Sequence, residues 1–408
     1  MRKPLKLKGL IIAEYYPPDI TAGAFRMEDM SIAMQGAGIE VTVLTSVPHR
    51  VVLEKVRASH ADPTGIQVVR IPVPPAGKSA VSRILNYGRF SLSAFNTALF
   101  RLPKDYNIVV VSSPPLLLAV TGYLVSRINK ARLIADVRDI WPDSAVAAGM
   151  LSEKSFLYKS SLWLERFFYR SADRITCVAK PMKEYISKFV APEKVKVLYN
   201  GVSTSVVRRI DEESVIALPR NSSKIHLVYA GNIGRLQGVD IIIRALLRLR
   251  DSGETDFELT IVGEGIELPN LKKLVETSTF DGIYFTGAVP REEVSKYCAN
   301  ADVLFLNLLD HPSLEKTVPS KLFDYLLYCK PVLAGIRGEG EEIIEMLETG
   351  VTFKPNNLDD LLRALAILKK KISDLKIKAV KNREYVLEHF YRPKIFREFF
   401  DGVGKEMR

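Results

Sequence analysis

The sequence predicts an α/β protein built from two domains, each with a doubly wound parallel sheet. Short apolar runs of strand length alternate with amphipathic helical segments in both halves of the chain, the pattern of parallel strands joined by crossover helices. Several of these runs end in loops that contain glycine, as expected where a strand passes into a helix. With 408 residues, 47% of them hydrophobic, the chain can fill two hydrophobic cores.

The first half begins with a strand at Leu7–Ala13. A polar loop and a helix to about Gln35 follow, and Gly36-Ala37-Gly38 ends that helix. Gly23, at the helix start, either lets backbone approach a ligand or is a plain turn glycine. The dinucleotide fingerprint G-x-G-x-x-G is absent after the first strand. Further strands are expected at Val41–Leu44, Ile66–Val73, Val109–Val111, Leu133–Val137, Arg174–Val178 and Val195–Leu198, and helices at Ser79–Leu102 and Lys154–Arg170.

Composition narrows the class of protein. A net charge of +11 favours anionic partners, but no zinc spacing, basic arm or other nucleic-acid signature is present, so we expect no nucleic acid. The uncharged run Ile108–Val125 has the length of a membrane span, yet Ser112-Ser113-Pro114-Pro115 at its centre favours a strand, a turn and a helix start. We therefore expect a cytoplasmic protein without a signal peptide, soluble or peripheral at the inner face of the membrane.

The second half repeats this logic. A strand at Ile225–Ala230 precedes the loop Gly231–Gly238, a candidate phosphate cradle at the start of a helix. Ser203–Lys224 is polar and predicts an irregular linker. Strands are also expected at Phe257–Val262, Ile283–Thr286, Val303–Leu306 and Val332–Ala334, and helices at Ile343–Leu347, Leu358–Lys371 and Asn382–Phe400.

The segment Ala301–Gly335 carries the most chemistry. Pro319 suits a first helical position, with Thr317 as one option for the cap, and apolar residues at helical spacing define a core face. Lys321 and Asp324 lie on another face. There a lysine in the first turn favours an anion, and a carboxylate one turn later suits a diol, as in a phosphorylated sugar nucleotide. Alternatively, the two form a solvated i,i+3 ion pair.

Two other stretches allow two interpretations each. Arg138, Asp139, Trp141 and Asp143 follow a strand at the end where parallel sheets bind ligands; the two carboxylates orient an acceptor or cap the following helix. The helix Ser79–Leu102 has an apolar stripe including Leu92, Phe95 and Leu99, with basic flanks. It either lies on an anionic membrane or packs as an ordinary surface helix; its basic residues are Lys78, Arg83, Arg89, Arg101 and Lys104.

Taken in chain order, these motifs resemble the retaining nucleotide-sugar glycosyltransferases of family four. That family has the GT-B fold, two Rossmann-like domains facing across a cleft. Its O-antigen, capsule and colanic-acid subgroup, which includes L-fucosamine transferases, is most similar at Arg138–Ser144. The matching motifs are Tyr16-Pro17-Pro18 with Gly23, Asn200-Gly201-Val202, Tyr229–Gly234, Ile261–Gly265, Phe285–Val289 and Pro319-Ser320-Lys321.

The resemblance implies a role for each matching residue. Asn232, Arg235 and Lys321 would line the diphosphate, backbone near Val289 would meet the base, and Asp324 would contact the ribose. Gly23 would face the phosphates from the other domain, and Arg138 would lie near the reacting sugar. The implied catalytic set is Arg138, Asp139, Lys321 and Arg235, and the implied donor-binding set is Gly23, Gly231, Asn232, Gln237, Gly263, Val289, Glu315, Lys316, Ser320 and Asp324.

The sequence departs from the family pattern at two places. Of the usual pair of glutamates eight residues apart, only Asp324 remains, because Lys316 holds the earlier position with Glu315 beside it. Asn232 and Gln237 replace the usual cations of the glycine-rich loop, which leaves Lys321 with Arg235 to neutralise the diphosphate. The resemblance implies retention without a covalent intermediate, a UDP-sugar donor, and neither cofactor nor metal.

The resemblance also assigns the domains. Residues 1–202 would form the acceptor domain, 203–222 a linker, 223–385 the donor domain, and 386–408 a helix packing back on the first domain. The expected reaction moves a sugar, for example an N-acetylamino sugar, to a lipid-linked or saccharide acceptor in surface polysaccharide synthesis. The alternatives are a nucleotide-sugar epimerase on the same scaffold and a non-catalytic sugar-nucleotide-binding subunit.

Overall fold

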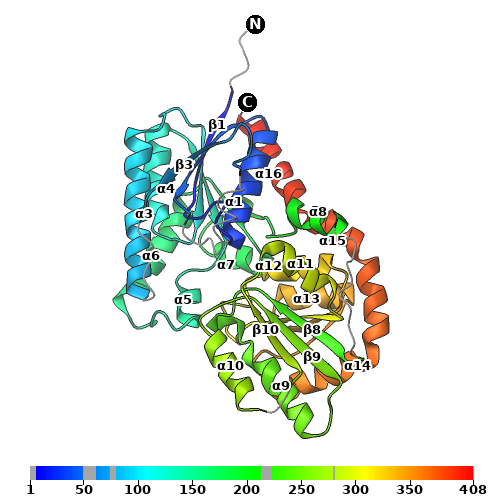
Figure 1. The fold of residues 1–408 in the computed structure, drawn as a ribbon. Coiled ribbons are helices and arrows are strands. Elements are labelled where there is room, and N and C mark those ends of the chain that lie inside the picture. The colour runs from blue at the N-terminus through cyan, green and yellow to red at the C-terminus, as the bar shows by residue number, and fades with distance from the viewer. Residues whose placement is uncertain (1–5, 49–60, 74–79, 213–222, 279–280, 408) are drawn as a thin grey trace. The chain divides into compact units, whose positions relative to one another are not determined.

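The computed structural model describes residues 6–48, 61–73, 80–212, 223–278 and 281–407. The chain forms two compact units (Figure 1). Unit 1 comprises Met1–Asn200 together with Arg392–Arg408, and unit 2 comprises Gly201–Tyr391. Each unit contains one parallel sheet with helices on its faces. This is the Rossmann-like arrangement that the alternation of strands and helices predicted for each half of the chain.

The sheet of unit 1 is entirely parallel and has the order β3-β2-β1-β4-β5-β6-β7. The chain runs outward from β1 to β3 and then returns to the other side of β1. A crevice for a ligand is therefore expected at the carboxyl ends of β1 and β4, where the direction of winding reverses. The strands are β1 (Lys8–Ile12), β2 (Glu40–Ser46), β3 (Gln67–Ile71), β4 (Ile108–Ser113), β5 (Arg132–Val137), β6 (Arg174–Cys177) and β7 (Val195–Val197).

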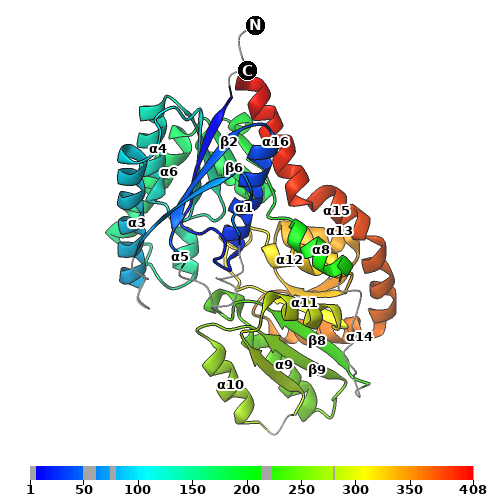
Figure 2. The ribbon, with the colours of Figure 1, turned by 45° about the horizontal axis from the view of Figure 1, so that its top comes forward.

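Helices cover both faces of this sheet (Figures 1 and 2). On one face α1 (Ala22–Gly36) packs against α16 (Arg392–Met407), so the end of the chain completes the core of unit 1 through Phe396 and Phe400. On the other face α4 packs between α3 and α6. The remaining bounds are α3 (Ala80–Phe100), α4 (Leu118–Asn129), α5 (Asp143–Ala147), α6 (Phe156–Ser171), α7 (Lys180–Ile186) and the 3-10 turn η1 (Pro192–Lys194).

Unit 2 repeats the design with a parallel sheet in the order β10-β9-β8-β11-β12-β13. Its winding reverses between β8 and β11. The strands are β8 (Ile225–Ala230), β9 (Phe257–Val262), β10 (Ile283–Gly287), β11 (Val303–Asn307), β12 (Val332–Gly335) and β13 (Gly350–Thr352). The helical elements are α8 (Thr204–Glu212), η2 (Arg235–Gln237), α9 (Asp240–Asp251), α10 (Leu268–Glu276), α11 (Arg291–Ala299), α12 (Ser320–Leu327), α13 (Glu339–Leu347), α14 (Leu358–Lys381) and α15 (Arg383–Phe390).

Two expectations about the connections are wrong. The predicted irregular linker contains the helix α8. Most of this helix is polar, and of its described side chains only Val206 is buried. Residues 213–222 lie outside the described part of the chain. The predicted single helix at Asn382–Phe400 is two helices, α15 in unit 2 and α16 in unit 1. Pro393 explains the break, because proline lacks the backbone N–H that a continuous helix would need there and its ring crowds the preceding turn.

The interpretation of Ile108–Val125 as strand, turn and helix start is confirmed by β4 and α4. Among the helices of the described residues, none has the length and apolar character that crossing a bilayer requires. Ser79 and the side chain of Arg83 in the predicted helix Ser79–Leu102, together with Lys78 before it, lie outside what the structure describes.

Candidate active site

Helix α12 carries two of the predicted polar residues to the carboxyl edge of the unit 2 sheet. Its core face is as predicted, with Leu322, Phe323 and Leu326 buried. Pro319 is the N-cap rather than the first helical residue, and no side chain caps the helix, so Thr317 is not the cap. Lys321 and Asp324 lie on the face away from this core and line one pocket of about 80 Å³.

Lys321 lies against an aromatic ring within this pocket. Its Nζ is 3.7 Å from the ring centroid of Tyr229, the distance of a cation–π contact. No hydrogen bond or ion pair joins Nζ to another described residue, so the predicted i,i+3 ion pair with Asp324 is not formed. Burial lowers the pKa of Lys321 to about 7, and the charge of Asp324 offsets part of that shift. The side chain is therefore poised to gain a proton when an anion binds beside it.

The pocket also contains residues that the sequence interpretation did not identify. Arg209 reaches it from α8, and Ser295 and Cys298 line it from α11. Tyr325 receives a hydrogen bond from the Ala230 amide (2.9 Å), which fixes the end of β8 beside Lys321. These elements are far apart in sequence and have no common motif, so no local pattern could have identified them. The full lining is Val206, Arg209, Ala230, Val294, Ser295, Cys298, Lys321, Asp324, Tyr325 and Tyr328.

The glycine-rich loop after β8 is held by its own polar side chains. The Gln237 Oε1 atom accepts hydrogen bonds from the Gly234 amide (3.1 Å) and from Asn232 Nδ2 (3.2 Å). Asn307, at the end of β11, donates from Nδ2 to the carbonyls of Gln237 (3.0 Å) and Gly238 (3.1 Å). Gln237, predicted to bind donor, therefore shapes the loop through its oxygen, and Asn307 is a further residue that the sequence interpretation missed.

The glycines at the ends of β8 and β9 allow close backbone packing. Gly231 has a φ of 139°, and Gly263 has a φ of 130°, both conformations that favour glycine. A Cβ added to Gly263 would lie 2.1 Å from the carbonyl oxygen of Gly231. Gly263 thus packs against Gly231, whereas Gly231 itself faces Lys321: a Cβ there would lie 2.7 Å from Nζ.

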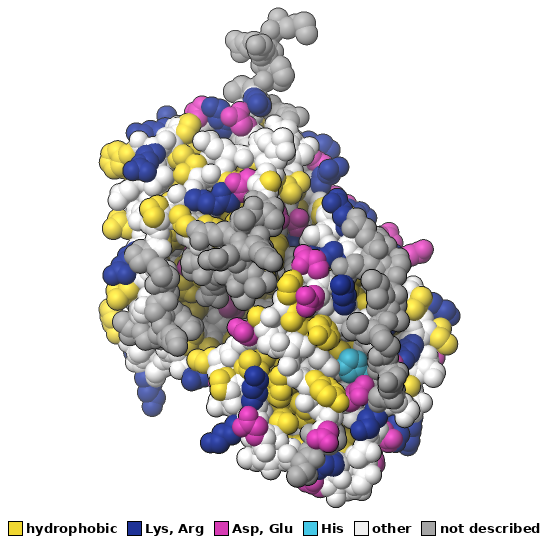
Figure 3. All heavy atoms as spheres, in the orientation of Figure 1, with side chains coloured by type: hydrophobic (Ala, Val, Ile, Leu, Met, Phe, Trp, Pro, Cys, Tyr) yellow, Lys and Arg dark blue, Asp and Glu magenta, His cyan; other side chains and the backbone are white. Residues whose placement is uncertain are grey.

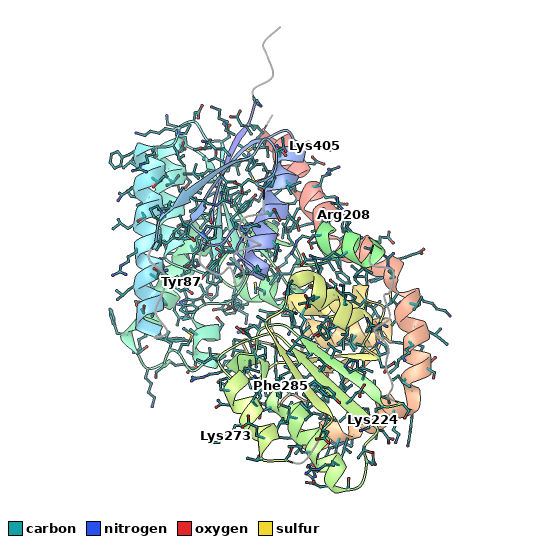
Figure 4. All side chains as sticks on the ribbon, viewed as in Figure 1. Tyr87, Arg208, Lys224, Lys273, Phe285 and Lys405 are labelled. Carbon is teal, nitrogen blue, oxygen red and sulfur yellow. The ribbon has the colours of Figure 1, made fainter. Side chains whose placement is uncertain are left out.

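Arg235 does not join Lys321. It forms an exposed ion pair with Glu267 (3.4 Å) and lines a different cavity of about 610 Å³ between α9 and α10. Arg244 and Lys273 line the same cavity, and Figure 4 labels Lys273 on α10. The two cations expected to share the diphosphate therefore line separate cavities in unit 2.

The other predicted donor residues lie in loops around α12 and β10. Glu315 is exposed, and its carbonyl oxygen would be 2.3 Å from a Cβ on Gly338, so its backbone packs on that glycine. Lys316 is half-buried, and Ser320 is the first residue of α12. Val289 is half-buried in the loop after β10, directly before the Pro290 N-cap of α11.

In unit 1 the predicted cation, Arg138, lies at the carboxyl ends of β4 and β5. Its Nε donates to Ser112 Oγ (2.8 Å), and its Nη2 donates to the Pro114 carbonyl (2.8 Å). Gly23, in the first turn of α1, lies next to the guanidinium, because a Cβ there would be 2.2 Å from Nη1. The structure therefore brings Gly23 and Arg138 together, although they are 115 residues apart (138 − 23).

The carboxylates after β5 are not helix caps. The N-cap of α5 is Pro142, and no side chain caps that helix, so the capping interpretation of Asp139 and Asp143 is wrong. Asp143 is the first helical residue and accepts a hydrogen bond from Tyr158 Oη (3.0 Å). Burial raises the pKa of Asp139, and the nearby Arg138 charge offsets part of the rise.

A buried ion pair fixes α1 to β5 beneath Arg138. Arg26 and Asp136 are fully buried and joined at 2.7 Å, and Thr176 also donates to Asp136 (2.6 Å). Burial alone would raise the pKa of Asp136, but the charge and hydrogen bonds of Arg26 hold that pKa below its ordinary value. Arg26 donates further to the Leu198 carbonyl (2.9 Å). The sequence interpretation missed this pair because its partners are 110 residues apart.

No group of three or more His, Cys, Asp or Glu side chains that could hold a metal ion occurs among the residues described. The two predicted cations, Lys321 and Arg138, each have at least one nitrogen without a hydrogen bond to a described residue. Each unit thus presents a fixed cation at the edge of its sheet where the winding reverses, which suits an anionic ligand.

Comparison with known proteins identifies two family models. Residues 22–201 match the glycosyl transferase 4-like domain, and residues 211–383 match the glycosyl transferases group 1 family. The chain is 26% identical over 297 residues to a protein of Pseudomonas aeruginosa named "Probable glycosyltransferase WbjE", covering 71% of this chain and 73% of that protein.

Two solved structures show the same fold. The Anabaena protein HepE in complex with UDP-glucose superposes with a TM-score of 0.68 at 15% identity, covering 98% of this chain and 100% of that chain. WaaG, a glycosyltransferase involved in lipopolysaccharide biosynthesis, gives a TM-score of 0.66 at 16% identity, covering 97% and 99%. Together the two family matches span most of the chain, which is therefore a glycosyltransferase with the GT-B fold.

Proposed function

We propose that the chain transfers a sugar from a nucleoside diphosphate sugar to a hydroxyl group of an acceptor, with retention of anomeric configuration. The observation that carries this proposal is the pairing of Lys321 and Asp324 in one pocket of unit 2. A lysine in the first turn of α12 meets the diphosphate, where the helix N-terminus also favours negative charge. Asp324, one turn later, accepts hydrogen bonds from the ribose hydroxyls.

In the proposed reaction the bond between the anomeric carbon and the phosphate oxygen breaks, and the acceptor oxygen bonds to that carbon on the same face. The acceptor proton passes to the departing phosphate oxygen. Charge develops on the diphosphate, so the protein's contribution is a preorganised cation at that position. Lys321 is such a cation once the anion has raised its pKa from about 7. Neither a cofactor nor a metal is part of the proposal.

Arg138 acts on the sugar side of the reaction in this proposal. Its guanidinium is fixed by Ser112 and by the Pro114 carbonyl, while Nη1 makes no hydrogen bond to a described residue. A fixed arginine with one unused nitrogen can hold a phosphate oxygen or a sugar hydroxyl. The half-buried Asp139 beside it is a second group for orienting the acceptor.

We propose a UDP-sugar as donor, for which the HepE complex with UDP-glucose provides the support. A place in surface polysaccharide synthesis is proposed from the resemblance and from WaaG, a relative in fold involved in lipopolysaccharide biosynthesis. The test incubates the purified chain with a panel of nucleotide sugars, including UDP-N-acetylamino sugars, and follows the released nucleotide by mass spectrometry. Release of UDP from one donor supports the proposal, whereas no turnover of any donor with lipid-linked or saccharide acceptors, or isomerisation of the donor, contradicts it.

We further propose that unit 1 docks on the cytoplasmic face of an anionic membrane, where a lipid-linked acceptor would be available. Large hydrophobic side chains are exposed on three helices that pack side by side: Leu92 (63%) and Phe100 (78%) on α3, Leu124 on α4, and Phe156 (85%) and Trp163 (67%) on α6. Of the predicted stripe on α3, Leu85 and Leu92 are exposed, whereas Phe95 and Leu99 are half-buried. In Figure 3, hydrophobic and basic side chains gather along the edge of unit 1 where α3 lies.

The charge of this surface fits an anionic lipid. On α6 a groove of about 350 Å³ is lined by Lys159, Arg166 and Arg170 around Trp163 and Phe167, whose rings are stacked. Each basic residue at an anionic surface contributes about 1 kcal/mol, and an amphipathic aromatic adds insertion at the headgroups. Three such cations suffice for reversible docking.

Liposome co-sedimentation tests this docking. The chain should sediment with vesicles containing anionic phosphatidylglycerol at low salt and should be released at high salt. The triple variant Lys159→Glu, Arg166→Glu and Arg170→Glu should remain in solution. A matched triple reversal of exposed cations on unit 2, Arg248→Glu, Lys369→Glu and Lys370→Glu, should sediment like the original chain. Docking through this surface is contradicted if both variants lose vesicle binding equally, or if the original chain does not bind the vesicles.

A further inference from the structure

The guanidinium of Arg138 occupies the space that a side chain at position 23 would fill. A Cβ on Gly23 would lie 2.2 Å from Nη1, 2.9 Å from Cζ and 3.3 Å from Nη2. Gly23 is the second residue of α1 and has ordinary helical backbone, so neither a turn nor a positive φ requires a glycine there. What the position requires is room for the neighbouring cation.

Two other groups hold the guanidinium in that place, and a third fixes the backbone of Arg138. Ser112, buried at the end of β4, accepts from Nε, and the Pro114 carbonyl accepts from Nη2. The Arg138 amide donates to the Ser113 carbonyl (2.9 Å), which fixes the backbone from which the side chain extends. Two of the three guanidinium nitrogens are thus held, and Nη1 is the one directed at Gly23.

The helix that carries Gly23 is itself fixed to the strand that leads directly into Arg138. Arg26 follows Gly23 by three residues, so both lie on the same side of α1. Asp136 lies on β5, two residues before Arg138, which directly follows that strand. The buried Arg26–Asp136 pair therefore fixes the distance between Gly23 and Arg138. Because this pair is fully buried, α1 cannot shift to make room for a larger residue at position 23 without disturbing it.

Unit 2 shows the same arrangement. Gly231 follows β8, as Gly23 follows β1, and a Cβ on Gly231 would lie 2.7 Å from Nζ and 2.8 Å from Cε of Lys321. Gly231 also has a positive φ of 139°, so its substitution would strain the backbone as well. Gly23 has no such constraint, which makes it the position where the role of the space alone can be tested.

We propose that Gly23 and Ser112 are positioning residues for Arg138: the glycine leaves the space in which the guanidinium is held, and the serine fixes its direction. This inference rests on the proposed role of Arg138 at the sugar. It differs from a role of Gly23 in direct backbone contact with the donor phosphates, because the glycine then acts only through the arginine. Placing the cation before substrate binds is the kind of preorganisation on which charge stabilisation depends.

A double-mutant cycle separates the two roles of Gly23. Gly23→Ala should lower kcat about 10- to 100-fold, the scale of losing one preorganised donor, with donor KM changed less than about threefold. In an Arg138→Ala background the same substitution should lower kcat by less than about twofold, since no guanidinium remains to displace. Alanine favours helix more than glycine does, so the fold is not at risk. Gly36→Ala is the matched control in the same helix, because a Cβ there meets no atom closer than 3.6 Å and should leave kcat unchanged.

Chemical rescue adds a readout that a purely structural role would not change. Guanidinium added to Arg138→Ala should restore part of the activity by entering the empty space, and it should fail to do so in Gly23→Ala with Arg138→Ala. Ser112→Ala should weaken rescue. If Gly23→Ala costs the same in both backgrounds, or weakens UDP binding equally in both, the glycine contacts the donor and the inference is wrong.

A spectroscopic test is independent of turnover, so it distinguishes this inference from the proposed function. The Nε proton of Arg138, donated to the buried Ser112, should exchange slowly with water and give a resolved ¹H–¹⁵N signal. Gly23→Ala and Ser112→Ala should each abolish that protection, whereas Gly36→Ala should preserve it. Protection that survives Gly23→Ala contradicts the inference even in a chain that shows no transfer activity.

Discussion

At the residue scale, the surroundings of Lys321 disfavour the charged form of its amine. Burial lowers its pKa to about 7, while Asp324 offsets part of that shift. The cysteine and the tyrosines around it do not change charge near neutrality, because burial raises the pKa of Cys298 to about 12 and raises the pKa values of Tyr229, Tyr325 and Tyr328.

This environment predicts proton uptake when a nucleoside diphosphate binds. Below pH 7 the amine of the free protein is already charged, and above pH 7 it is neutral and must gain a proton to meet the anion. UDP affinity should therefore fall as pH rises from 7 to 9, by at most about tenfold per pH unit. Titration calorimetry of UDP binding in two buffers of different ionisation enthalpy should detect the proton that Lys321 takes up. Lys321→Arg should remove both the pH dependence and the proton uptake; a titration of the original chain that is flat from pH 7 to 9 would show that Lys321 does not meet the diphosphate.

Sequence could place these residues but not describe their surroundings. The i,i+3 spacing predicted that Lys321 and Asp324 share a face of α12, and the pocket confirms that they do. Tyr229 is 92 positions away (321 − 229), and Cys298 is on another helix. The desolvation that moves the pKa of Lys321 is thus a product of tertiary packing. For the same reason Ser112, Arg209 and Asn307 were not identified, since each acts on a residue remote in sequence.

At the element scale, the position of α1 depends on one buried ion pair. Arg26 and Asp136 join the helix to β5, and Arg26 also bonds to the carbonyl of Leu198. Removing the carboxylate would leave a buried guanidinium without its counter-charge, which typically costs about 3–5 kcal/mol. Asp136→Ala should lower the midpoint of thermal unfolding of unit 1 accordingly.

The control for that prediction is an exposed ion pair in the same unit. Glu406 bridges Arg132 and Arg174 with a side chain 44% exposed, and exposed pairs contribute about 0–1 kcal/mol. Glu406→Ala should therefore shift the midpoint far less. Similar shifts for the two variants would mean that the buried pair does not fix α1, and the argument for the Gly23 position would lose its support.

Elements were predictable where burial repeats in a regular pattern. The expected strands Ile225–Ala230 and Phe257–Val262 coincide with β8 and β9, because every residue of a buried parallel strand can be apolar. The helix α8 was missed for the opposite reason, since a short surface helix with one buried residue resembles a polar linker. The break between α15 and α16 could have been predicted from Pro393. The aromatic residues at helical spacing suggested one continuous helix instead.

At the scale of the whole molecule, the chain divides where sequence composition changes little. Unit 2 ends at Tyr391, and the last helix returns to complete the core of unit 1. Two parallel sheets were predictable from the alternation of strands and helices in each half. The exact points of division, at Asn200 and Tyr391, depend on packing of distant segments.

The proposed chemistry predicts activity without a divalent metal. In that proposal Lys321, in the pocket of unit 2, supplies the positive charge that the departing diphosphate requires. Transfer measured in excess EDTA should therefore retain most of its rate. A loss that magnesium or manganese restores would show that this side chain does not carry the charge stabilisation alone.

The most direct test of the central claim is turnover of the Lys321→Ala variant. If this lysine stabilises the departing diphosphate, its loss should reduce kcat at least ~100-fold, on the scale of one transition-state contact, while the fold persists because the position is not on the core face of α12. Lys273→Ala, an exposed lysine in the other cavity of unit 2, should keep the original rate. A Lys321→Ala variant that turns over as fast as Lys273→Ala would contradict the account.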